Sequence, residues 1–337
     1  MPRPPGGKGP AGGGNGMKKA WLYIVVATVL FSSMETMLKF VSGQFNPIQL
    51  TFGRFLVGGL VLLPVALRTL RRRGAKLDGK SIAYFALLGF LGVALSMSFY
   101  QMAVTRIPAS VVAVLFSSNP LFVALLAFLL LREPLGRNQV AGLLLDIVGI
   151  VVIVLPDRDS LDGVGLLCIF ASTLLFAFYG VCGKRKCQQF GGVVVTCMSF
   201  LLGSAVMIVL AALSHIPALS AALTEAGLGL FADIPFFTGY TLSALPVVLY
   251  TFIGVTGLGY TCYFLIMEVA STHEASLVFF FKPALAPVLA WLILGEQIAG
   301  NMVAGIVLIL AGSLLSLLPW LRSLAQGRKE RALEEQK

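Results

Sequence analysis

The chain has 337 residues, of which 58% are hydrophobic and 12% are charged, and its formal net charge is +10. Since an ordinary soluble domain is about a quarter charged, this composition excludes a water-soluble globule. The apolar residues come in blocks of roughly 20, which is the length of helix that crosses the hydrocarbon core of a bilayer, so we expect a multi-pass membrane protein.

The N-terminal tail, residues 1–17, is expected to be disordered and cytoplasmic, because 11 of its first 16 residues are Pro or Gly. It has no apolar core of its own and therefore does not read as a cleavable signal peptide. Met17, which precedes two lysines, is an alternative start to Met1.

Ten apolar runs, each with at most one charged residue, follow the tail, and they predict ten membrane-spanning helices. Strands of a membrane barrel would be about ten residues long and would alternate in polarity, which these runs do not. In chain order the runs are Ala20–Leu38, Ile48–Leu67, Ser81–Ala103, Ser110–Leu131, Val140–Leu155, Val164–Gly183, Val193–Leu213, Ala244–Met267, Ala275–Leu294 and Val303–Trp320.

Lysine and arginine are distributed unequally between the two sides of these spans. Twenty of them lie in the N-terminal tail, in the connections on its side and in the basic C-terminal tail 321–337, whereas the other side has only Arg106 and Arg158. By the positive-inside rule both termini are cytoplasmic, and we expect the chain in the cell (inner) membrane. Topology and attraction to anionic lipid account for the net charge, so no nucleic-acid partner is expected. The expected assembly is a monomer or a homodimer.

Two parts of the chain match each other at an offset of 163 residues. The run from Pro120 to Glu133 aligns with the run from Pro283 to Glu296, and 13 of the 37 aligned pairs from 119 to 155 are identical. This indicates an internal duplication, 18–156 and 157–320. Among the matched pairs are Asn138 with Asn301, Gly142 with Gly305, and Gly149 with Gly312.

Each copy contains five predicted spans, and an odd number makes the second copy enter the membrane from the opposite side. The charges agree, because the hairpin 132–137 carries two arginines and its copy 295–300 carries no cation. Inverted halves are the architecture of secondary transporters, in which a site near the midplane opens alternately to each face. The sequence therefore predicts an all-α membrane protein whose ten transmembrane helices form two inverted five-helix repeats.

The duplicated Pro-to-Glu hairpins occur together with the pattern Phe31-Ser32-Ser33…Lys39…Pro47…Arg54-Phe55. On these residues the chain resembles, over 18–320, the ten-span EamA-type permeases of the drug/metabolite transporter superfamily. The resemblance implies transport of small polar metabolites, often by export, and no single substrate. Phe31-Ser32 stands where such proteins commonly have Trp-Gly, and Lys282 stands where an acidic residue often precedes the proline. The lysine argues against a cationic substrate.

Ionisable residues inside a span are costly and are therefore candidates for function. Glu35 and Lys39 are spaced i, i+4 on the first span, and Arg54 lies at a similar depth on the second. We expect Glu35 to pair with Arg54 or with Lys39, as a structural pair or gate, or to contact the substrate. Lys282 is expected to face a central cavity, either as an anchor for an anion or as the partner of an acidic group.

Polar and aromatic residues at helical spacing form a second group of candidates, which either line the cavity or make contacts between helices. Asn119 precedes Pro120, where the helix loses a backbone bond and is expected to bend. Glu133 and Glu296 are expected to cap helix ends. The predicted substrate-binding residues are Glu35, Arg54, Tyr100, Asn119, Tyr179, Tyr260, Tyr263 and Lys282.

The sequence thus predicts a secondary active exporter of a small polar metabolite that carries a carboxylate or a phosphate, such as an amino acid or a related compound. The alternatives are an exporter of drugs or neutral metabolites and, less favoured, a membrane-embedded enzyme. The chain has no His-Glu-x-x-His, Gly-x-Ser-x-Gly or phosphate-binding loop to support an enzyme. No metal, cofactor or catalytic residue is expected, and if protons are coupled, Glu35 is the leading carrier.

Overall fold

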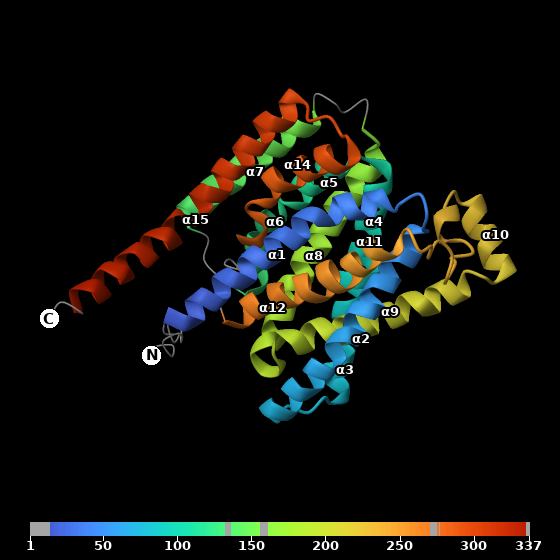
Figure 1. Cartoon of the computed structure of the whole chain (residues 1–337), viewed down its shortest axis with the longest axis horizontal. Coiled ribbons are helices and arrows are strands. Elements are labelled where there is room, and N and C mark those ends of the chain that lie inside the picture. The colour runs from blue at the N-terminus through green and yellow to red at the C-terminus, as the bar shows by residue number, and fades with distance from the viewer. Residues whose placement is uncertain (1–13, 132–135, 156–160, 270–274, 276, 335–337) are drawn as a thin grey trace.

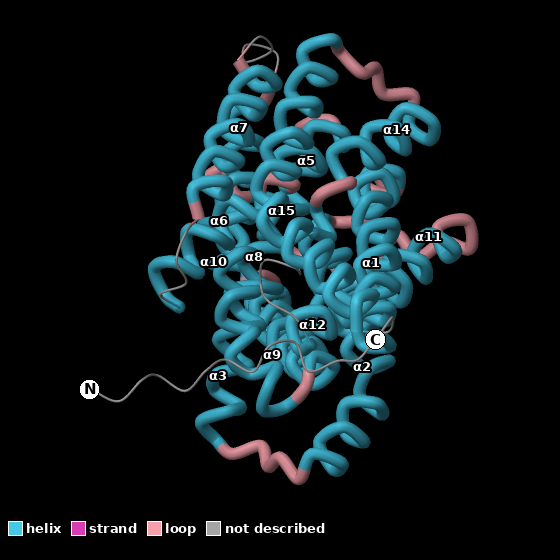
Figure 2. The backbone as a smooth tube through the Cα atoms, turned by 90° about the vertical axis from the view of Figure 1, so that its left-hand side faces the viewer, coloured by secondary structure: helices cyan, strands magenta, loops and turns pink. Residues whose placement is uncertain are grey.

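The computed structural model describes residues 14–131, 136–155, 161–269, 275 and 277–334. These residues are mainly helical and contain no strand, and Figure 2 shows the helices joined by short connections. Glu133 and most of the N-terminal tail lie outside the described residues. The first helix begins at Gly14, inside the tail that was expected to be disordered.

Nine helical stretches of the described residues are long and apolar enough to cross a membrane. The tenth predicted span corresponds to the apolar part, Gly300–Ser316, of the last helix. The prediction of an all-α membrane fold is therefore confirmed. The elements are α1 (Gly14–Phe40), α2 (Pro47–Arg73), α3 (Gly79–Gly89), η1 (Phe90–Leu95), α4 (Ser96–Arg106), α5 (Ala109–Phe116), α6 (Asn119–Leu126), η2 (Ala127–Leu131), α7 (Arg137–Val154), α8 (Gly163–Phe190), α9 (Gly192–Leu213), α10 (Pro217–Glu225), η3 (Gly229–Phe231), α11 (Leu245–Leu249), η4 (Tyr250–Gly259), α12 (Tyr260–Val269), η5 (Leu277–Phe279), α14 (Lys282–Leu294) and α15 (Gly300–Glu334).

Helix α8 begins at a side-chain cap outside the span. The Asp162 carboxylate accepts hydrogen bonds from the backbone N–H groups of Val164 (2.7 Å) and Gly165 (3.0 Å), which have no partner within the helix. The Gly165 N–H and the guanidinium of Arg106 hold the pKa of Asp162 below its usual value. The cap therefore stays charged at neutral pH.

Two spans are interrupted at equivalent positions of the repeats. Helices α5 and α6 are separated at 117–118, and η5 and α14 are separated at 280–281, which is the same place at the 163-residue offset. In each case a proline, Pro120 or Pro283, is the second residue of the new helix, where its missing N–H costs nothing. The predicted bend at Pro120 is confirmed. Asn119 and Lys282 consequently become the first residues of helices that begin within the membrane.

Helices α7 and α15, the last span of each repeat, pack against each other at the upper left of Figure 1. A Cβ atom on Gly305 would lie 2.6 Å from the backbone oxygen of Gly149, and one on Gly149 would lie 2.8 Å from the oxygen of Gly305. The backbones therefore touch, which only glycine permits here. These glycines belong to the pairs that the internal alignment matched.

Leucine in place of Gly305 is expected to force α7 and α15 apart, because the side chain would overlap the backbone of Gly149 and the side chain of Ile153. Overpacking of this kind costs about 1–3 kcal/mol, so the purified Gly305→Leu protein should melt at a lower temperature in detergent. Gly300→Ala is the control, since a Cβ there meets no atom within 4 Å. Equal melting temperatures for Gly305→Leu and wild type would contradict the close approach.

Candidate functional site

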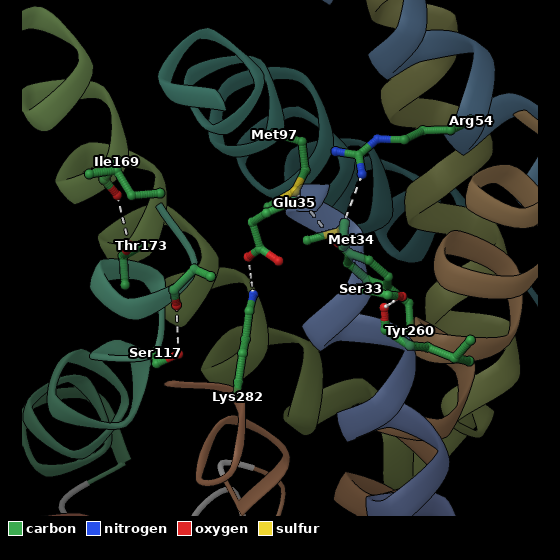
Figure 3. Close-up of polar contacts among 12 residues, drawn as sticks. Ser33, Met34, Glu35, Arg54, Met97, Ser117, Ile169, Thr173, Tyr260 and Lys282 are labelled. Carbon is green, nitrogen blue, oxygen red and sulfur yellow. Dashed lines mark hydrogen bonds and ion pairs between the residues drawn. The ribbon is translucent and has the colours of Figure 1, made fainter. Parts of the chain in front are cut away.

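An ion pair joins the two repeats in the middle of the molecule. The Lys282 ammonium, at the first residue of α14, pairs with the Glu35 carboxylate from α1 (Figure 3). The exposed fractions of the two side chains are 0% and 1%. An unpaired charge at this depth would be strongly destabilising, so each residue compensates the charge of the other.

Three aromatic rings surround the Lys282 ammonium. Its nitrogen lies 4.8 Å from the ring centroid of Phe116, 5.9 Å from that of Phe279 and 6.0 Å from that of Tyr100, within the range of cation–π attraction. Phe116 and Phe279 immediately precede the two helix breaks and are themselves 163 residues apart. The duplication therefore supplies two of the three rings.

Arg54, on α2, is a second cation in the centre and is completely buried. Its Nη1 donates to the sulfur of Met34 at 3.4 Å, and its guanidinium carbon lies 4.7 Å from the ring centroid of Phe55. Nε and Nη2 have no hydrogen-bond partner among the residues that the structure describes. The same residues offer Arg54 no ion-pair partner, so a planar donor group remains available to an anion.

The expected partner of Glu35 was wrong, because the carboxylate pairs with Lys282 rather than with Lys39 or Arg54. Lys39 lies one turn nearer the end of α1, where its ammonium donates to the backbone oxygens of Val104 (2.7 Å) and Ile107 (3.1 Å). These carbonyl groups at the end of α4 attract a cation through the helix dipole. Of the alternatives for Lys282, the structure shows the partner of an acidic group.

Tyr260, like Tyr100, lies near Glu35 and Arg54. Its hydroxyl donates to the sulfur of Met97 at 3.0 Å, and its ring packs edge-on against Phe31 and Phe55, with centroids 5.0 and 5.6 Å away. The charged groups thus border an aromatic surface.

Three other predicted residues lie farther into the surrounding helices. Tyr263 stacks on Phe176 with centroids 5.6 Å apart. The hydroxyl of Tyr179 shares a hydrogen bond of 2.8 Å with Ser199, and the Asn119 amide donates to the backbone oxygen of Thr173 at 3.3 Å. All three predicted residues are buried, and the contacts of Tyr179 and Asn119 serve packing between helices.

The sequence-based selection missed Phe116, Phe279, Met34 and Met97, which touch the charged residues or Tyr260. Apolar side chains in an apolar chain give no signal of their own. The two phenylalanines were nevertheless detectable, because they occupy matching positions in the repeats directly before the breaks.

The centre is closed to solvent on both sides. Glu35, Arg54, Lys282 and Tyr100 each have an exposed fraction of 0%. Any molecule that binds these groups therefore requires a conformational change to enter.

Comparison with known proteins agrees with the helical architecture and its duplication. The EamA-like transporter family matches the chain twice, at residues 18–155 and 163–318. An uncharacterized transporter of Clostridium kluyveri is 33% identical over 89% of this chain and 93% of its own length. One from Archaeoglobus fulgidus is 25% identical over 87% and 97%. A crystal structure that covers 90% of this chain and 98% of its own superimposes with a TM-score of 0.66 at 22% identity, which shows a shared fold.

Removal of one partner of the central ion pair is expected to destabilise the protein by about 3–5 kcal/mol, because it leaves an uncompensated buried charge. Glu35→Gln and Lys282→Met should each lower the melting temperature in detergent, and the double variant should be more stable than either single variant. Lys80→Met, at an exposed site, is the control. If the double variant lowered the melting temperature by the sum of the two single changes, direct pairing would be contradicted.

Proposed function

Because this chain belongs to the EamA-like transporter family, we propose that it carries a small polar metabolite across the membrane by opening its central site to each face in turn. Its membership in this family makes it a transporter that resides in the bilayer, and not an enzyme. Export is the proposed direction of transport. Both termini are proposed to lie in the cytoplasm, because the positively charged connections lie on their side of the membrane.

The buried and incompletely hydrogen-bonded guanidinium of Arg54 supports an anionic cargo. A guanidinium buried in the membrane centre is costly without a counter-charge, and two of its nitrogen atoms lack partners among the described residues. A carboxylate or a phosphate would accept two parallel hydrogen bonds from this group. The proposed cargo therefore carries one of these groups, as in an amino acid or a related metabolite.

Lys282 supplies a second positive charge, but in the closed centre its ammonium is paired with the Glu35 carboxylate. An anionic cargo competes with Glu35 for this ammonium. Once released, the carboxylate would be a buried charge without a partner, which is costly in free energy. Glu35 is accordingly the proposed proton carrier if transport is coupled to protons.

The aromatic residues favour a second candidate function, the export of neutral or drug-like molecules. Phe31, Tyr260, Phe176 and Phe279 form a continuous network with ring centroids 5.0 to 6.0 Å apart. Such a surface binds apolar groups without requiring a charge. Under the favoured proposal the same rings contact the apolar part of the anion.

Protein reconstituted in liposomes is expected to exchange a carboxylate or phosphate compound in counterflow assays. Arg54→Gln should weaken apparent affinity about 10- to 100-fold, since hydrogen bonds to a charged group are lost. Arg72→Gln, at an exposed position near the end of the same helix, is the control.

The assay panel contains amino acids, organic acids, phosphorylated metabolites and nucleosides. Counterflow of uncharged compounds alone would support the second candidate function. No counterflow of any compound by folded protein would contradict transport of these classes.

Replacement of Glu35 by glutamine is expected to remove the pH dependence of flux, because the side chain no longer binds or releases a proton. Flux is measured in liposomes with an imposed pH gradient, for the wild type and for Glu35→Gln. Glu225→Gln, an exposed acid on α10, is the matched control. A wild-type flux that does not change with the pH gradient would exclude Glu35 as a proton carrier.

A further inference from the structure

The corner between α4 and α5 is held from two sides. Lys39 of α1 donates to the backbone oxygens of Val104 and Ile107 at the end of α4, at 2.7 and 3.1 Å. Glu296, which follows α14, accepts from the backbone N–H groups of Ala109 (2.8 Å) and Ser110 (3.0 Å) and from the Ser110 hydroxyl (2.7 Å). A cation thus caps the carbonyl end of one helix, and a carboxylate caps the amide end of the next.

The corner between α8 and α9 is held in the same way. Arg73, the last residue of α2, donates to the backbone oxygen of Gln188 near the end of α8 at 3.0 Å. Glu268 of α12 accepts from the N–H of Gly192, the first residue of α9, at 2.6 Å. Arg73 and Glu268 also form an ion pair with each other.

We call the first set of contacts the α4–α5 clamp (Lys39 and Glu296) and the second the α8–α9 clamp (Arg73 and Glu268). In both clamps the cation comes from the first repeat and the carboxylate from the second. The α4–α5 corner belongs to the first repeat, and the α8–α9 corner belongs to the second. Each clamp therefore ties the two repeats together.

The clamps lie at opposite ends of the bundle. The first turn of α8 adjoins the α4–α5 corner, because Asp162 bonds to Arg106 at 2.9 Å. The last turn of α8 forms the α8–α9 corner. Between them α8 has 28 residues, or about 42 Å of helix, which is more than the thickness of the hydrocarbon core.

The charged side chains of both clamps are only partly exposed, with 32% for Arg73 and 19% for Glu268 and intermediate exposure for Lys39 and Glu296. Charge-assisted hydrogen bonds in such positions are stronger than those of a solvated pair, yet water can replace them when the helices separate. Both clamps are closed in a structure whose central charges are inaccessible from either side.

We propose that the two clamps are the gates of the transporter. The α4–α5 clamp closes the external face, the α8–α9 clamp closes the cytoplasmic face, and release of one of them opens the central site to its own side. Lys39, Arg73, Glu268 and Glu296 are thus positioning residues, which determine the face of access without touching the cargo. This inference rests on the alternating access proposed above.

Thiol labelling at the centre tests the proposal. Ser32→Cys places a reporter on α1, one turn before Glu35; Ser32 is fully buried, and its hydroxyl has no hydrogen-bond partner among the described residues. A membrane-impermeant maleimide is applied to intact cells and to inside-out vesicles, and modification of residue 32 is followed by peptide mass spectrometry. This readout separates the reporter from the five native cysteines.

In the reporter background, Glu296→Gln and Lys39→Gln should each accelerate labelling from outside the cell by about tenfold. Glu268→Gln and Arg73→Gln should do so only from the cytoplasmic side. Glu225→Gln and Arg72→Gln are the matched controls, at exposed positions, and should label like the parent. Two variants for each clamp protect the test from the misfolding of one, which size-exclusion chromatography detects.

Opposite shifts for the two clamps support the proposal. Labelling that matches the controls, that rises on the same face for both clamps, or that is absent throughout would overturn it. Because no cargo is present, a negative transport screen and a negative labelling result are separate findings.

Discussion

The cost of charge in the middle of a membrane governs the centre of this protein. Glu35 and Lys282 lie there without solvent exposure, and only their contact makes both charges tolerable. Since one residue comes from each repeat, the same contact fixes how the halves meet. The helix break before Lys282 serves this contact, because it lets a helix begin at the depth of Glu35. Arg54 has no ion-pair partner among the described residues, and this contrast distinguishes a structural charge from the one that we propose binds an anion.

Much of the architecture could be predicted from the sequence, because hydropathy, positive charges and duplication are properties of whole segments. The break at Pro120 was predictable for a local reason, since proline removes a backbone hydrogen bond. The partner of Glu35 was not. Spacing along one helix favoured Lys39 and a similar depth favoured Arg54, whereas the packing of α14 against α1 brings Lys282 to the carboxylate. Contacts between distant spans depend on helix rotation, on which composition gives no information.

Glu296 shows a similar limit at the helix ends. Its capping role was predictable from its position after a span, but the helix that it caps belongs to the other repeat. The four clamp residues all use unpaired backbone groups at helix ends, which every bundle has at its corners. Charged residues that ordinarily finish one helix can thus connect two halves of a molecule.

The glycine contacts between α7 and α15 also define the symmetry of the molecule. Gly142 approaches Gly312, and Gly149 approaches Gly305. The 163-residue offset converts Gly142 into Gly305 and Gly149 into Gly312, so it converts one contact into the other. The pseudo-twofold axis that relates the repeats therefore passes between these two contacts. A rotation about this axis that exchanges the two repeats therefore maps the crossing of α7 and α15 onto itself.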